Sequence, residues 1–160
     1  IKAGLERFQP VWGRMDIFQT ANGIHIIDDS YNANPESMKA AITTLRTLRR
    51  NNRSLFVAGD MLELGDQAES LHKQMGAWAA AADIDKLLIT GEFADAVIAG
   101  AINAKMSPAD IFTGTREEIL ATLKQLLKPG DWILIKGSRG ARMEAIVKGL
   151  KSWATIKPEA

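Results

Sequence analysis

The sequence predicts an α/β fold: a Rossmann-like, mostly parallel sheet of about six strands with helices on both faces. Short apolar runs alternate with amphipathic stretches of helical spacing, the pattern of parallel strands joined by right-handed crossovers. Near the start, the Asn22-Gly23 pair separates two apolar runs and predicts a hairpin, which would supply one antiparallel strand. The length of 160 residues suits a single domain with its own core.

The expected elements run in the order of a hairpin and then alternating helices and strands. Strands are expected at about residues 15–19, 24–28, 54–58, 86–90, 111–112 and 132–135, and helices at about 35–49, 67–82, 92–101, 116–127 and 141–153. We expect one domain over 1–160, in which residues 1–14 are an interdomain linker and the tail at 155–160 is frayed.

The hairpin and the first helix carry the clearest local signals. The Asn22-Gly23 pair is typical of a type I′ turn, which joins two antiparallel strands with a two-residue loop. In the helix at 35–49, Met38, Ile42 and Leu45 recur at the spacing of one helical face. That face is expected to pack on the sheet.

Other local signals fix the ends of elements. Asn34 is a good N-cap, and Pro35 suits the first helical position because its missing N–H has no partner there in any case. The run at 54–58 is apolar throughout, as expected of a strand buried on both faces. The Pro129-Gly130 pair breaks the chain before the strand at 132–135, and a glycine-flanked turn then leads into the last helix.

Composition excludes several classes of protein. A formal net charge of +1 gives no electrostatic footprint for nucleic acid or an anionic membrane. No apolar run approaches the ~20 residues that span a bilayer, and the start lacks the apolar core of a signal peptide. The chain has no cysteine and only His25 and His72, which we expect to be ordinary strand-face and helix-face residues, so no metal site is expected.

The segment after the second expected strand is the richest in polar side chains. Asp28, Asp29, Tyr31 and Asn32 gather between a strand's carboxyl end and a helix's amino end, where open α/β sheets bind ligands. Helix capping explains Asn34 but not the other four residues. The sequence therefore predicts a ligand-binding loop here, and a well-capped turn is the alternative.

Two further loops at strand ends carry charged groups. Asp60 lies in a loop bounded by glycines, and its alternative interpretation is a polar connector. Lys136 ends a strand, and Ser138 and Arg139 follow between two glycines at an expected helix start. This arrangement predicts an anion nest whose guanidinium suits a carboxylate or phosphate, and solvated charges at a helix start are the alternative.

Several catalytic signatures are missing from the chain. It contains no Gly-x-x-x-x-Gly-Lys-Ser/Thr, so it has no P-loop, and no Gly-x-Gly-x-x-Gly of a dinucleotide-binding fold. No Ser or Cys nucleophile with a His partner is evident. The sequence thus predicts binding loops without a complete catalytic centre.

At this point the residues resemble those of a known family. The string Asp28-Asp-Ser-Tyr-Asn-Ala-Asn-Pro-x-Ser-Met38 is similar to a motif in the third domain of the Mur-type ligases. Three other stretches agree in content and order, namely Gly4-Leu-x-x-Phe-x-Pro-Val-x-Gly-Arg14, Gly59-Asp-Met-x-Glu-Leu-Gly65 and Lys136-Gly-Ser-Arg139. The resemblance covers most of the chain, and four ordered motifs together are highly specific.

The resemblance implies an activity shared among domains. In this family a central domain carries the P-loop and the magnesium ligands, and it phosphorylates a carboxylate of the UDP-N-acetylmuramoyl peptide with ATP. An amine then displaces the phosphate; in the branch that this chain resembles, the amine is that of D-alanyl-D-alanine and the acceptor is the tripeptide. The third domain closes over the central one. The resemblance implies a cytoplasmic enzyme of peptidoglycan synthesis, a monomer without nucleic-acid or membrane partners, from which this chain is excised and inactive alone.

The resemblance also implies roles for particular residues. The ATP-binding residues are Arg14, Asp29, Tyr31, Asn32 and Asn34, and the residues on the side of the dipeptide substrate are Asp60, Lys136, Ser138 and Arg139. Arg14 matches the arginine that contacts ATP phosphates and supports catalysis, while the acid that meets the ribose is Asp29, with Asp28 as the alternative. No metal ligand is assigned to this chain, since ATP and Mg²⁺ chemistry belongs to the central domain.

Two alternatives remain. A phospho-acceptor receiver domain also has an acidic pair, an Asp, a Thr and a Lys at strand ends, which Asp28-Asp29, Asp60, Thr90 and Lys136 imitate. However, only one helix separates the acidic pair from the strand before Asp60, where a receiver needs two helices and a strand. The second alternative is another Mur-type or folylpolyglutamate ligase; those chains carry Asp-x-Ala-His in the nucleotide loop, whereas this loop has no histidine.

Overall fold

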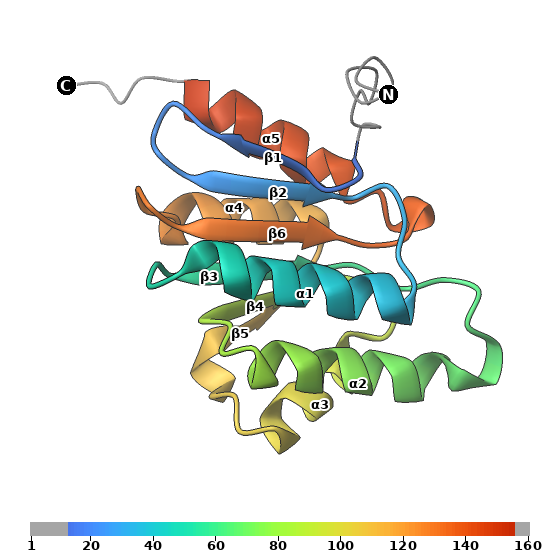
Figure 1. Cartoon of the computed structure of the whole chain (residues 1–160). Helices are drawn as coiled ribbons and strands as arrows, with labels where there is room; N and C mark the ends of the chain where they lie inside the picture. Colours follow the sequence, from blue (N-terminus) through green and yellow to red (C-terminus); the bar gives the residue numbers. More distant parts are fainter. Residues whose placement is uncertain (1–12, 156–160) are drawn as a thin grey trace, which may run out of the picture.

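Residues 13–155 are described by a computed structural model, in which six strands form one sheet in the order β1-β2-β6-β3-β4-β5 (Figure 1). The strands are β1 Asp16–Gln19, β2 His25–Asp29, β3 Ser54–Ala58, β4 Lys86–Ile89, β5 Ile111–Thr113 and β6 Trp132–Lys136. The α-helices are α1 Pro35–Arg49, α2 Ala68–Ala81, α3 Ala94–Asn103, α4 Arg116–Leu126 and α5 Glu144–Thr155, with 3₁₀ turns η2 Gly65–Gln67, η3 Pro108–Asp110 and η4 Arg139–Ala141.

Strand pairing confirms the predicted Rossmann-like sheet. β1 pairs with β2 antiparallel, and all the other neighbours in the sheet are parallel. The last strand, β6, lies between β2 and β3, so strands from the two ends of the chain become neighbours at the centre of the sheet. The arrows of β2 and β6 point to the same edge in Figure 1, which is the edge where loops after parallel strands can form a site.

Helices cover both faces of the sheet, as predicted. Helices α1, α2 and α3 pack on one face, and α4 and α5 pack on the other (Figure 1). The alternation of side chains along each strand divides the core accordingly: in β3, Phe56 contributes to the first face, whereas Leu55 and Val57 contribute to the second. All three are completely buried, which explains why residues 54–58 are apolar throughout.

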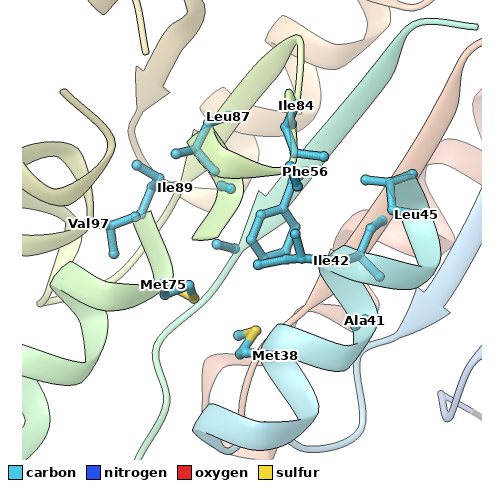
Figure 2. Close-up of a cluster of buried hydrophobic side chains, with 14 of the residues drawn as sticks. Met38, Ala41, Ile42, Leu45, Phe56, Met75, Ile84, Leu87, Ile89 and Val97 are labelled. Carbon is cyan, nitrogen blue, oxygen red and sulfur yellow. The ribbon is translucent and has the colours of Figure 1, made fainter. Parts of the chain in front are cut away.

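The core under α1 and α2 is built around Phe56. Figure 2 shows Phe56 beside Ile42 of α1, with Met38 and Met75 contributing from α1 and α2. Met38, Ile42 and Leu45 are buried, and this confirms the stripe predicted from their spacing. Burying side chains of this size contributes ~1.5–3 kcal/mol each, so this packing fixes α1 and the loop in front of it.

The predicted type I′ hairpin turn is wrong, although the hairpin itself is present. Gly23 has a φ of 81°, but Asn22 does not have the positive φ that a type I′ turn requires at both central residues. Instead the N–H of Gly23 donates to the carbonyl of Thr20 at 3.0 Å, and the N–H of Thr20 donates to the carbonyl of Ile24 at 2.9 Å. The connection is therefore longer, and the Thr20 hydroxyl lies 2.5 Å from Asn22 Oδ1 as part of this turn.

The last helix begins later than the sequence suggests. Residues 139–141 form the 3₁₀ turn η4, and Arg142 then adopts a left-handed conformation with φ of 52° before α5 starts at Glu144. A left-handed residue cannot continue a right-handed helix. Ser138 and Arg139 therefore belong to a separate short turn and not to the first turn of α5.

Within residues 13–155, no helix is long and apolar enough to cross a membrane. The stretch from Gly4 to Trp12, which forms most of one motif of the family resemblance, lies outside the described residues. Its last two residues, Gly13 and Arg14, lie within them.

Candidate functional site

The register of the sheet brings Asp29 and Lys136 side by side. Asp29 ends β2 and pairs with Lys136 at the end of β6, which in turn pairs with Ala58 at the end of β3. Asp29 and Lys136 lie two residues after Ile27 and Leu134, which both contribute to the core under α1. Both polar side chains therefore point to the α1 face of the sheet, at its carboxyl edge.

Asp29 and Lys136 form a buried ion pair. Lys136 Nζ lies 2.5 Å from Asp29 Oδ2, and only 8% of Asp29 and 2% of Lys136 are exposed. Lys136 Nζ also donates to the carbonyl of Asn32 at 2.8 Å, and the N–H of Met15 donates to Asp29 Oδ1 at 3.1 Å. The pair thus joins β2, β6, the segment before β1 and the loop before α1 at one point.

Asp28 lies on the opposite face of the sheet. It is completely buried, and its Oδ1 accepts hydrogen bonds from the hydroxyl and the N–H of Ser30, at 2.5 and 3.2 Å. Asp28 contributes to neither of the two cavities at this edge, whereas Asp29 lines one of them. The structure therefore separates two carboxylates that are adjacent in the sequence.

The loop between β2 and α1 is held by a capping box. Asn34 Oδ1 accepts a hydrogen bond from the N–H of Ser37 at 2.8 Å, and Ser37 Oγ accepts one from the N–H of Asn34 at 3.0 Å. Pro35 occupies the first helical position. The capping role expected of Asn34 is confirmed, and its side chain also lines both cavities.

Tyr31 lies between two arginines from distant parts of the chain. The guanidinium carbon of Arg14 is 4.7 Å from the ring centroid of Tyr31, and that of Arg139 is 5.6 Å from it. The N–H of Tyr31 donates to the carbonyl of Gly13 at 2.8 Å, which holds the segment before β1 against the loop. Cation–π contacts of this kind orient two cations without neutralising them.

Ser138 connects three loops of this edge. Its Oγ accepts a hydrogen bond from the N–H of Leu62 at 2.9 Å and donates one to the carbonyl of Ala33 at 3.3 Å. Its own N–H donates to the carbonyl of Asp60 at 2.9 Å. With only 5% of the residue exposed, the Ser138 hydroxyl has its proton and one lone pair engaged by the protein.

Asp60 points away from these residues, toward the loop after β4. Its Oδ2 accepts a hydrogen bond from the N–H of Glu92 at 2.8 Å, and its Oδ1 accepts one from the N–H of Phe93 at 3.3 Å. The carboxylate lies so close to Gly91 that a Cβ there would come within 2.3 Å of Oδ1. Asp60 therefore ties two loops together and lines neither cavity.

Two cavities lie on either side of the loop before α1. The first, of about 430 Å³, is lined by Arg14, Met15, Asp29, Asn32, Asn34, Ser37, Ala40, Ala41, Thr44 and Lys136. The second, of about 340 Å³, is lined by Asn32, Ala33, Asn34, Leu62, Glu63, Leu64, Ser138, Arg139 and Gly140. We call them the α1 cavity and the η4 cavity. Asn32 and Asn34 line both and separate them.

Most of the predicted site residues line one or both of these two cavities. Arg14, Asn32 and Asn34 share the α1 cavity with Asp29, as the resemblance implies for ATP. Ser138 and Arg139 share the η4 cavity. Lys136, expected with the dipeptide, lines the α1 cavity instead. Tyr31 contacts an arginine from each group.

A larger cavity of about 600 Å³ lies at the opposite edge of the sheet. Two of its cations already have carboxylate partners: Lys86 Nζ lies 2.5 Å from Asp110 Oδ1, and Arg53 binds Asp131, which does not line the cavity, through two nitrogens. The hydrogen bond to Asp131 raises the pKa of Arg53 above its ordinary value. Charges paired in this way serve the fold, and nothing in this cavity continues the motifs of the carboxyl edge.

Within residues 13–155, no group of three His, Asp or Glu side chains could hold a metal ion. The chemistry of the carboxyl edge agrees with this, because the Asp29 carboxylate is paired with a cation and the Asp60 carboxylate accepts two backbone N–H groups. The described part of the chain therefore does not offer the cluster of free oxygen ligands that Mg²⁺ requires.

Sequence reasoning missed two residues near the cavities. The N–H of Met15 binds Asp29, and Thr44 lines the α1 cavity one helical turn beyond Ala40. Small side chains recur at helical spacing at positions 37, 40, 41 and 44 of α1, and a face of small side chains could have indicated a cavity. No signal in the sequence indicated the backbone contact of Met15.

The chain belongs to a family of ligase domains: the Mur ligase, glutamate ligase domain matches residues 13–139. This match confirms the resemblance to the Mur-type ligases that the sequence motifs indicated. The alternative, a receiver domain, is therefore wrong.

Two relatives by sequence carry the same name. The UDP-N-acetylmuramoyl-tripeptide–D-alanyl-D-alanine ligase of Bacillus subtilis is 36% identical over 147 residues, which are 92% of this chain and 32% of that protein. The ligase of the same name from Escherichia coli is 37% identical over 155 residues, 97% of this chain and 33% of that protein. The chain thus spans about a third of the length of these relatives.

Solved structures agree with the sequence relatives. MurF from Acinetobacter baumannii superposes with a TM-score of 0.81 at 34% identity, over 94% of this chain and 33% of that chain. MurF ligase from Thermotoga maritima, in complex with ADP, superposes with a TM-score of 0.76 at 26% identity, over 92% of this chain and 32% of that chain.

Proposed function

We propose that this chain serves as the C-terminal domain of an ATP-dependent ligase that joins D-alanyl-D-alanine to UDP-N-acetylmuramoyl-tripeptide in peptidoglycan synthesis, in the cytoplasm. The observation that carries the proposal is the α1 cavity, where Arg14 and the Asp29–Lys136 pair face asparagines of one loop. Relatives that bear the name of this activity match nearly the whole chain.

The proposed reaction forms an amide bond in two steps. ATP phosphorylates the terminal carboxylate of the tripeptide and releases ADP, and the amine of the dipeptide then attacks the acyl phosphate carbonyl and expels phosphate. Because this chain has no P-loop, the transferred phosphate must be held by another domain. The same applies to Mg²⁺, for which the described residues offer no ligand cluster.

On the nucleotide side, the charge and the hydrogen-bonding groups of each residue at the α1 cavity define its proposed role. Arg14 is exposed at the mouth of the α1 cavity, so its guanidinium can meet phosphate oxygens when a second domain closes. Asp29 presents a carboxylate suited to ribose hydroxyls, and its pairing with Lys136 keeps it oriented. Asn32 and Asn34 supply amide groups at the same cavity, and Tyr31 orients Arg14.

On the dipeptide side, Arg139 is the residue that can contact substrate directly. It is exposed at the η4 cavity, where a planar guanidinium can hold the dipeptide's carboxylate through two hydrogen bonds. Ser138 is buried and acts by joining the loops around it. Asp60 acts indirectly, since its carboxylate accepts the N–H of Glu92 and thereby fixes the loop after β4. Lys136 acts through Asp29.

The proposed partners are the enzyme's own central domain, ATP, the dipeptide and the UDP-linked tripeptide, and we propose that the enzyme works as a monomer. Under this proposal each of the two cavities binds its own substrate, and Asn32 and Asn34 lie between the two cavities. A shared wall of this kind would place the nucleotide and the incoming amine within one loop's width of each other.

The test is product formation by the complete ligase that carries this domain. With ATP, UDP-N-acetylmuramoyl-tripeptide and D-alanyl-D-alanine, we expect phosphate release that depends on the dipeptide. The 160-residue chain alone should release no phosphate above a control without protein, because its sequence has no P-loop to hold the transferred group. Dipeptide-dependent phosphate release by the chain alone, or none by the complete ligase, would contradict the proposal.

A further inference from the structure

His72 is a completely buried residue under one wall of the η4 cavity. Its Nδ1 lies 2.7 Å from the carbonyl of Ala68, and the N–H of Met61 donates to its Nε2 at 2.9 Å. The ring also stacks on Phe93, with centroids 4.4 Å apart. Each polar atom of the imidazole therefore has a backbone partner.

These contacts define the tautomer of His72. A backbone N–H can only donate, so Nε2 accepts from Met61, and the ring proton lies on Nδ1, which donates to Ala68. Asp60 Oδ1 lies 3.7 Å from Nε2, but its hydrogen bonds come from the N–H groups of Glu92 and Phe93. His72 is thus a neutral acceptor and not the cation of an ion pair.

The contact with Met61 leads directly to the cavity wall. The next N–H, that of Leu62, donates to Ser138 Oγ, and Glu63 then adopts a positive φ of 62°. Leu62, Glu63 and Leu64 together form one wall of the η4 cavity, which Arg139 also lines. Two successive N–H groups therefore fix this wall, one on His72 and one on Ser138.

We propose that His72 is a positioning residue for the incoming amine substrate, although it does not touch it. The inference rests on the proposed function, in which the η4 cavity holds the dipeptide beside Arg139. Without an acceptor at this place, the buried N–H of Met61 would lose its partner. The segment 62–64 would then shift and alter the shape of the dipeptide site, while the α1 cavity, which it does not line, would stay unchanged.

The experiment compares three variants of the complete ligase. His72→Leu removes the acceptor but keeps an apolar side chain, and His72→Gln restores an oxygen near the position of Nε2. Met75→Ala is the matched control: it removes a buried side chain one turn further along α2 and leaves the hydrogen bond from the Met61 N–H to His72 in place. For each, KM for D-alanyl-D-alanine and KM for ATP are measured with the other substrate saturating.

We expect His72→Leu to raise the dipeptide KM about tenfold, with the ATP KM changed less than about twofold, and His72→Gln to recover most of the loss. Equal effects of His72→Leu and Met75→Ala on the two constants would reduce His72 to a structural residue and overturn the proposal. A glutamine variant no better than the leucine variant would overturn it as well. Wild-type ligase without dipeptide-dependent activity would instead overturn the proposed function, so the two failures are distinguishable.

Discussion

Lys136 Nζ and Asp29 Oδ2 lie 2.5 Å apart although the two residues are 107 positions apart in the sequence. They meet because β6 pairs with β2 in parallel, in a register that sets Asp29 opposite Lys136. This pair occupies the carboxyl edge of the sheet, next to the loop that starts α1. Its burial makes it both a structural link and a part of the candidate site.

The first prediction concerns the stability of this pair. Lys136→Met should lower the free energy of unfolding by ~3–5 kcal/mol, because it leaves the Asp29 carboxylate buried without a cation. Urea unfolding of the chain measures this. The double variant Lys136→Met, Asp29→Leu should recover a large part of the loss, since no buried charge then remains.

Arg46→Ala is the control for an ion pair without burial. Arg46 Nη2 lies 3.8 Å from Asp83 Oδ2, and the two side chains are 57% and 74% exposed. Its removal should change stability by less than ~1 kcal/mol. A loss as small as this in Lys136→Met would show that the pair at the carboxyl edge does not hold the fold.

The sequence indicated the elements of the fold well but not their order in the sheet. Periodicity and capping residues identified α1 and its N-cap Asn34, since these signals are local. The insertion of β6 between β2 and β3 is a long-range result, and no local pattern carries it. For that reason no sequence signal indicated that Lys136 lies beside Asp29, and the family resemblance alone assigned it to the dipeptide side with Arg139.

Local conformation accounts for the other differences. Arg142 adopts a left-handed φ of 52° without being a glycine, so the late start of α5 had no sequence signal. His72 follows the spacing of buried residues in α2, and a histidine there is read as an ordinary core residue until its backbone partners are known. The sequence left Asp28 and Asp29 as alternatives for the same role. Only the structure distinguishes them, because their side chains lie on opposite faces of the sheet.

The second prediction concerns Arg14. In the complete ligase, Arg14→Ala should lower turnover and raise the ATP KM more than the dipeptide KM. A guanidinium near the γ-phosphate stabilises charge that develops during transfer, and Arg14 lines the α1 cavity but not the η4 cavity. Initial rates with each substrate varied separately measure this. An unchanged turnover with a raised dipeptide KM would assign Arg14 to the other substrate.

The third prediction separates capping from binding at Asn34. Asn34→Ala should lower the free energy of unfolding by ~1 kcal/mol, since it removes the acceptor of the Ser37 N–H. Asn34→Asp keeps that acceptor and should restore stability. If Asn34→Asp restores stability but the ATP KM stays raised, the amide itself contacts the nucleotide. Thermal unfolding and ATP kinetics on the same preparations test the two roles.

The last prediction concerns Arg139, which is exposed at the η4 cavity beside Tyr31. A solvated surface charge contributes ~0–1 kcal/mol, whereas a bidentate contact with a carboxylate in a closed cleft should contribute ~1.5–3 kcal/mol. Arg139→Lys keeps the charge but loses the planar fork. It should therefore raise the dipeptide KM while the ATP KM stays nearly unchanged.

Arg142→Lys makes the same chemical change three residues later, at an exposed arginine that lines neither cavity, and should leave both constants at their wild-type values. The measurement varies D-alanyl-D-alanine at saturating ATP in the complete ligase. Should Arg139→Lys and Arg139→Ala both keep the wild-type dipeptide KM, the guanidinium would not hold the carboxylate. The contact between Arg139 and Tyr31 would then be its whole role, and the dipeptide would have to bind through other groups of the η4 cavity.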